Sequence, residues 1–172
     1  MRDIVSEVGT FYSGLTAAPT ITSTQTSAAA ALTGYDGAMI YILATTLSSA
    51  GTMTPVIQVT NDNGSGSAVS ANWTNVPAAD LVLWTSTSAT NFAPVKATDA
   101  NGLQTGNIQP TALSSTVALN QRVGYIGTSF TSAGTTYNAD WLRVVSTVAS
   151  SWSAPYDVII LLGRPRLMPS NV

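Results

Sequence analysis

The chain contains two short apolar stretches, Ala38-Met39-Ile40-Tyr41-Ile42-Leu43-Ala44 and Asp157-Val158-Ile159-Ile160-Leu161-Leu162, around which its fold can be worked out. Alternate residues of a β-strand face opposite sides of the sheet, so each stretch is apolar on both faces. Strands of this kind occur in the middle of a sandwich or at a subunit interface. We expect both segments to occupy one of these two positions.

Six candidate strands share one signature, which is four to eight residues rich in Val, Ile, Thr and aromatic side chains between turn-forming residues. They are Ala38–Ala44, Val56–Thr60, Asp80–Trp84, Arg122–Thr128, Trp141–Val148 and Tyr156–Leu162. In the fifth candidate, Arg143 and Val145 are predicted to face one side of the sheet. Leu142, Val144 and Ser146 are predicted to face the other.

Turn signals separate these candidates. Asp36-Gly37, Asn63-Gly64 and Asn101-Gly102 are dipeptides that tolerate the positive φ of tight hairpin turns. No convincing amphipathic helix is present. We therefore predict an all-β fold, a jelly-roll-like β-sandwich with an extended N-terminal arm and a short C-terminal tail.

The organisation along the chain follows from composition. Residues 1–34 are rich in Thr, Ser and Ala, and we expect an arm that is extended, loosely packed or ordered against a partner, with one or two helical turns at Ala28–Leu32 as the alternative. Residues 35–163 form the predicted sandwich. Residues 164–172 form a tail, because Pro165 and Pro169 lack the N–H that a central strand needs.

Composition excludes several classes of function. Only 8% of the 172 residues are charged, against about 25% in a typical soluble domain, and the chain has neither Cys nor His. Cysteine and imidazole chemistry, disulfides and thiolate zinc sites are therefore excluded. Six basic residues are too few for a nucleic-acid footprint or a basic membrane surface. Charges near Met1 argue against a signal peptide, and no apolar run is long enough to cross a bilayer.

We find no convincing catalytic, cofactor or metal site in the sequence, and we expect no enzyme. A glycosidase needs two facing carboxylates, whereas most of the eight Asp and Glu residues stand beside turns or at strand ends. The loops at Asn61–Ser65 and Asp99–Gly102 begin like calcium loops but lack the bidentate Glu. Four tryptophans remain open to a carbohydrate-stacking role or to packing in core and interface: Trp73, Trp84, Trp141 and Trp152.

The low charge favours a protein whose surface is largely buried in an assembly. Interface cores are depleted in charge and enriched in aromatic residues, Met and Arg. Five of the six basic residues here are arginines, which suit bidentate or stacked contacts between subunits.

Several motifs, taken in order, resemble those of small head proteins of tailed bacteriophages. They are Thr54-Pro55-Val56-Ile57-Gln58-Val59-Thr60-Asn61-Asp62, Trp73-Thr74-Asn75-Val76, Asp80-Leu81, Gln121-Arg122-Val123-Gly124-Tyr125-Ile126-Gly127, Trp141-Leu142-Arg143-Val144-Val145 and Gly163-Arg164-Pro165-Arg166. The resemblance covers residues 35–166. It implies a capsid decoration (cement) protein with a β-sandwich fold that binds the outside of the shell as an oligomer, a homotrimer. Asp140-Trp141 departs from the basic-aromatic pair expected before Leu142, and the arm has no counterpart.

The resemblance also implies partners and a location. The partners are the major capsid protein and further copies of this chain, with no nucleic acid and no membrane. The protein would be made in the host cytoplasm and carried on the capsid exterior of the virion. Candidate capsid or subunit contacts lie in the arm and the tail: Ile4, Val5, Phe11, Tyr12, Arg164, Arg166 and Met168. The alternative function is a head-spike or tail module that binds a carbohydrate or receptor.

Overall fold

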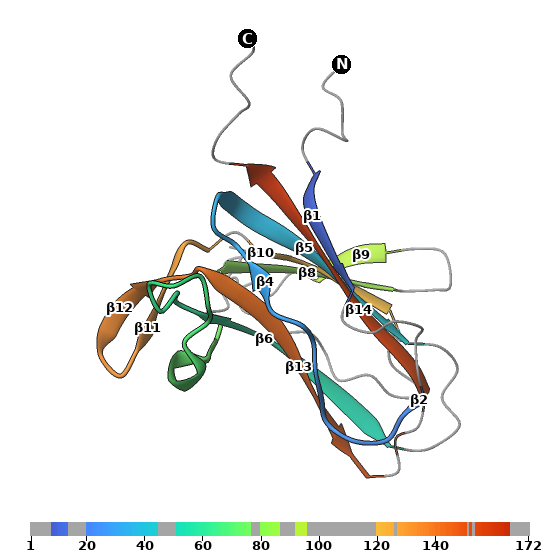
Figure 1. Ribbon diagram of the computed structural model, residues 1–172. Coiled ribbons are helices and arrows are strands. Elements are labelled where there is room, and N and C mark those ends of the chain that lie inside the picture. The colour runs from blue at the N-terminus through green and yellow to red at the C-terminus, as the bar shows by residue number, and fades with distance from the viewer. Residues whose placement is uncertain are drawn as a thin grey trace, which may run out of the picture.

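The computed structural model describes residues 8–13, 20–44, 51–76, 80–86, 92–95, 120–125, 127–150, 152 and 154–165. In this part of the chain, antiparallel sheets account for almost all regular structure, and a short 3₁₀ turn, η1, spans Ser70–Asn72. The all-β prediction is confirmed. Two sheets lie against each other, and a separate hairpin projects beside the smaller one (Figure 1).

The larger sheet has seven strands. Six follow the order β1 (Val8–Ser13), β14 (Ala154–Pro165), β5 (Tyr35–Ala44), β10 (Asn120–Tyr125), β8 (Leu81–Ser86) and β9 (Phe92–Val95), and β2 (Thr20–Ile21) also pairs with β14. The two apolar stretches are therefore neighbours in the middle of a sheet. They pair from Tyr156 opposite Ala44 to Pro165 opposite Tyr35.

The smaller sheet has five strands. Its order is β3 (Gln25–Thr26), β13 (Trp141–Ala149), β6 (Thr52–Thr60) and β7 (Thr74–Asn75), and β4 (Ala30–Ala31) also pairs with β13. The separate hairpin consists of β11 (Ser129–Ser132) and β12 (Thr135–Asn138). In β13, Leu142, Val144 and Ser146 are buried, while Arg143 and Val145 are only partly buried. The predicted division of this strand into two faces is confirmed.

One hydrophobic core lies between the two sheets. The larger sheet contributes Ile40 and Ile160, and the smaller sheet contributes Ile57 and Leu142. Each of these side chains is at most 1% exposed. Full burial of a side chain of this size stabilises the fold by about 1.5–3 kcal/mol. The β-branched and long aliphatic residues of the predicted strands thus supply the main driving force.

Residues 20–34 form an extended crossing segment that joins the two sheets along one side (Figure 1). β2 pairs with β14 of the larger sheet, and β3 and β4 pair with β13 of the smaller one. Ser27 fixes the middle of the segment, because its N–H donates to the Val144 carbonyl and its hydroxyl accepts from the Val144 N–H, both at 2.9 Å. Leu32 is 3% exposed in the core. The helical alternative at Ala28–Leu32 is wrong, because this stretch contains β4 instead.

Two turn predictions can be assessed. Asn63-Gly64 is a turn, with Gly64 at φ 83°. Asp36-Gly37 is not a turn, because both residues lie within β5, where Gly37 is opposite Gly163. The preceding turn ends at Gly34, whose φ of 89° favours glycine. The Asn101-Gly102 prediction lies outside the described residues.

The C-terminal boundary also differs from the prediction. β14 runs through Pro165, two residues beyond the predicted end of the sandwich. Pro165 is the last residue of the strand, a place where its missing N–H interrupts no further pairing.

Candidate interaction surfaces

The outer face of the larger sheet carries an apolar surface. Met39, Tyr41 and Leu43 of β5 alternate with buried residues, and so do Ile159 and Leu161 of β14. Leu161 is opposite Met39 and Ile159 is opposite Tyr41, so the five side chains belong to one face. An antiparallel sheet with water on one side normally alternates apolar and polar residues. We call these five residues the apolar face.

Backbone register extends this face towards its neighbours. Phe11 of β1 is opposite Leu161, and Arg122 of β10 is opposite Tyr41. Tyr12 is opposite Ile160, a core residue. The two predicted contacts Phe11 and Tyr12 therefore occupy register positions on opposite faces of the sheet.

The remaining predicted contacts are divided between the sheet and the ends of the chain. Arg164 lies in β14, next to its last residue. Ile4, Val5, Arg166 and Met168 lie outside the described residues.

A second surface, on the outer face of the smaller sheet, is centred on Arg143. Its Nε and Nη2 groups donate to Oε1 of Gln58 at 3.0 and 2.9 Å. Its guanidinium carbon lies 4.0 Å from the centroid of the Trp73 ring, a cation–π contact. Gln58 Nε2 in turn donates to Asn75 Oδ1 at 3.1 Å. These four residues, which we call the arginine cluster, connect β13, β6 and the β7 edge.

No carboxylate among the residues that the structure describes forms an ion pair with the cation of the arginine cluster. Burial lowers the pKa of Arg143, but a guanidinium remains charged at neutral pH. Within the described ranges, Arg143 has interactions only with Gln58 and Trp73. An arginine has five N–H donors, and the two bonds to Gln58 leave three of them available.

Beside this cluster, Trp141 is fixed by an aspartate-containing loop. The indole Nε1 donates to Asp62 Oδ2 at 3.1 Å. Asp62 Oδ1 accepts from the N–H groups of Gly64 and Gly66 at 2.7 and 3.2 Å. The bond from Trp141, followed by the backbone bonds, lowers the pKa of Asp62. Asp62 Oδ2 is thus bonded to Trp141 of β13 and Oδ1 to the loop backbone. No cluster of three potential metal ligands occurs among the residues described.

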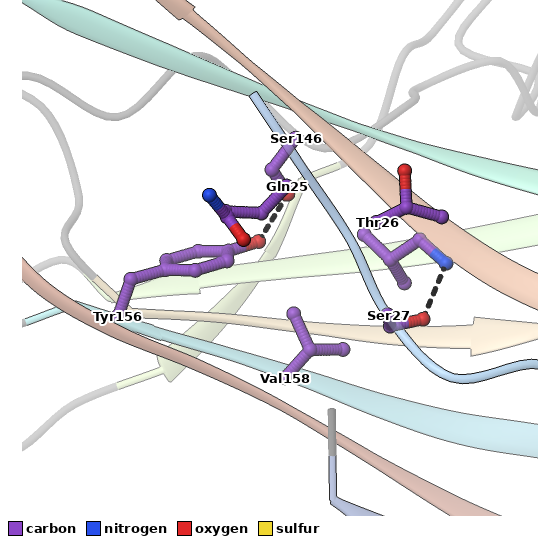
Figure 2. A pocket seen from close by; sticks show the side chains of 7 residues that line it. Gln25, Thr26, Ser27, Ser146, Tyr156 and Val158 are labelled. Atoms are coloured by element: carbon purple, nitrogen blue, oxygen red, sulfur yellow. Dashed lines mark hydrogen bonds between the residues drawn. The ribbon is translucent and has the colours of Figure 1, made fainter. Parts of the chain in front are cut away.

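The interior contains one buried polar pair under the crossing segment. The hydroxyls of Tyr156 and Ser146 are hydrogen-bonded to each other, and both residues are about 1% exposed (Figure 2). A cavity of about 10 Å³ lies against them, lined also by Gln25, Thr26 and Ser27. Burial raises the pKa of Tyr156. The pair is a packing element that lies between the crossing segment and the core.

The four tryptophans do not form one platform. Trp152 is 1% exposed and belongs to the core. Trp73 and Trp141 are partly buried around the smaller sheet. Sequence reasoning identified these two aromatic residues but missed Arg143 and Gln58 as their companions. The one available signal was the prediction that Arg143 lies on the opposite face of its strand from Leu142 and Val144.

Comparisons with known proteins add no relatives. No protein-family model, curated protein or solved structure matches this chain. Within the described residues, no helix is long and apolar enough to span a membrane.

Proposed function

We propose that this protein is a structural component of a phage virion, a capsid decoration protein with a jelly-roll-like sandwich that acts without catalysis. It would bind the major capsid protein on the outside of the head and bridge capsomers as a homotrimer. The observation that carries the proposal is the apolar face, whose five partly buried side chains stand in register on one sheet surface. Two charged residues border them, because Asp157 is opposite Leu43 and Arg122 is opposite Tyr41. The motif resemblance over residues 35–166 supplies the identity of the assembly.

The apolar face favours self-association for an energetic reason. Each of its side chains is already partly buried, so covering it completely adds about 1 kcal/mol, roughly half the value for full burial. Five such side chains on each subunit give several kcal/mol per interface before the entropy of association is subtracted. The overall charge of −2 opposes association only weakly.

Co-sedimentation with undecorated heads of the encoding phage tests the proposal directly. We expect saturable binding at a fixed ratio to the major capsid protein. Light scattering of the free protein should give the mass of a trimer. Failure to bind heads at micromolar concentration would refute the decoration function.

Ile159→Lys tests the role of the apolar face. A charge in the middle of this face should shift the free protein towards monomer. Thr147→Lys is a matched control, because Thr147 is exposed on the other sheet. If Ile159→Lys and Thr147→Lys have the same oligomeric state, the apolar face does not form the subunit interface.

A carbohydrate- or receptor-binding module on a head spike or tail is the second candidate. It is favoured by the placement of Trp73 and Trp141 around the outer face of one sheet. Quenching of tryptophan fluorescence by host surface polysaccharide, abolished in Trp73→Ala, would support it. An unchanged spectrum at saturating polysaccharide would exclude it.

A further inference from the structure

The two outer faces of the sandwich differ in chemistry. The apolar face offers aliphatic and aromatic carbon, whereas the arginine cluster offers a fixed cation between aromatic and amide groups. An interface that buries only carbon does not require such a cation. The arginine cluster therefore calls for a different partner from the one that covers the apolar face.

We infer that the arginine cluster is the surface that docks on the capsid shell, and that Arg143 receives the carboxylate of an Asp or Glu side chain of the major capsid protein. This inference rests on the proposed decoration function and adds to it the face that is used and the chemistry of the contact.

The end of the Arg143 guanidinium that suits a carboxylate is available to a partner. Gln58 occupies the edge formed by Nε and Nη2. The end of the guanidinium, where Nη1 and Nη2 each present a further N–H, has no partner among the residues that the structure describes. Two parallel N–H groups at this end match the two oxygens of a carboxylate.

The side chain is also positioned before any partner arrives. Trp73 covers one face of the guanidinium, and Gln58, held by Asn75, fixes its orientation in the plane. The conformational freedom that a free arginine would lose on binding is already reduced. Tryptophan and arginine are the residue types most enriched among those that dominate binding energy at protein interfaces.

Among the described residues, no carboxylate is paired with Arg143. Arg143 is partly buried, and its nearest hydrogen-bond acceptor is a neutral amide rather than a carboxylate. A carboxylate from a partner would replace lost hydration with a charge-assisted pair of hydrogen bonds. A stacked sugar is disfavoured, because the guanidinium already occupies a face of Trp73 and Asp62 holds the indole N–H of Trp141.

Three variants test this contact on undecorated heads. Arg143→Gln removes the charge, and Arg143→Lys keeps the charge but loses the fork-shaped donor set. Gln58→Glu is the sharpest variant, because it places a carboxylate within about 3 Å of the guanidinium and so supplies Arg143 with a counter-charge from within the protein. Gln25→Glu is the matched control, since it makes the same chemical change in a strand of the same sheet, at a residue whose side chain donates hydrogen bonds to Ser23 and has none to the arginine cluster.

We expect Arg143→Gln and Gln58→Glu to bind heads roughly 10- to 100-fold more weakly than wild type, the usual range for a hydrogen-bonded charge pair. Arg143→Lys should lie in between, and Gln25→Glu should match wild type. Wild-type binding should weaken as salt concentration rises. Circular dichroism melting and the trimer mass identify any variant that fails to fold. If Arg143→Gln fails, the head affinities of Gln58→Glu and Arg143→Lys, each compared with wild type, decide the test.

The remaining outcomes separate this inference from the proposed function. Wild-type affinity in all three variants would overturn the arginine contact and leave decoration in place. No binding by wild type would overturn the decoration function and the contact with it. A third outcome is that polygalacturonate quenches the fluorescence of wild type but not of Arg143→Gln, while Arg143→Gln still binds heads. This result would assign the arginine cluster to an acidic sugar and overturn the inference.

Discussion

Removal of both hydroxyls of the buried pair formed by Tyr156 and Ser146 should cost clearly less stability than the two single removals added together. Tyr156→Phe leaves the Ser146 hydroxyl buried without its partner, and the cavity beside it, about 10 Å³, is at the lower limit for one water molecule. An unsatisfied buried hydroxyl costs about 1–3 kcal/mol. Ser146→Ala should cost a similar amount, because it strands the tyrosine hydroxyl instead. The double variant strands neither group and should lose clearly less than the sum of the single losses.

Urea denaturation at one fixed protein concentration measures these losses. Tryptophan fluorescence, to which the buried Trp152 contributes along with three other tryptophans, provides one signal, and far-ultraviolet circular dichroism provides a second. At this chain length, 1 kcal/mol corresponds to about 2–4 °C in Tm, so each single variant should melt about 2–12 °C below wild type. Losses that add fully in the double variant would refute the argument that the two hydroxyls satisfy each other.

Three further predictions concern Tyr156, Gly127 and Leu32, whose surroundings are closely packed. Burial raises the pKa of Tyr156 in the folded state above its ordinary value of 10.0, so its contribution to stability should be complete below pH 10 and should be lost as the pH rises further. Urea midpoints measured over a pH series should fall less for Tyr156→Phe than for wild type. Gly127→Ala should cost about 1–3 kcal/mol of stability in the same assay, because a Cβ there would lie 2.5 Å from Asp80 Oδ2 and 2.8 Å from the ring of Tyr125. An unchanged urea midpoint would show that these two side chains shift without cost. Leu32→Ala should cost about 2–5 kcal/mol, and a loss below 0.5 kcal/mol would mean that the crossing segment contributes little to the core.

The strands predicted from the sequence are those that contain enough apolar and β-branched residues to be recognised on their own. All six candidates correspond to strands of the two sheets, because alternation of Val, Ile and Leu reports burial directly. The strands β2, β3 and β4 were missed because each has only two residues and lies in a segment rich in Thr, Ser and Ala. β1 has six residues, but its large apolar residues Val8, Phe11 and Tyr12 do not alternate along the strand. Their pairing is set by the edges of β13 and β14, and no local pattern encodes that tertiary contact.

The arginine cluster was beyond sequence reasoning for a related reason. Alternation in β13 placed Arg143 on the outer face. Its companions depend on the register between β13 and β6, which sets Arg143 opposite Gln58, and on the pairing of β6 with β7, which sets Gln58 opposite Asn75. Register over such sequence distances follows from the packed sheet as a whole.

The pairing of the chain's beginning with its end governs when folding can be completed. Val8 is opposite Gly163, and Thr26 is opposite Val145, so the first strands have no edge to pair with until the last strands exist. During synthesis, β1 to β4 leave the ribosome long before β13 and β14 do. Contacts across so much of the chain close slowly, since the entropy of a long loop is lost before any pairing compensates for it. The two sheets therefore cannot be completed before β13 and β14 have been synthesised, and until then β1 to β4 lack the strands with which they pair.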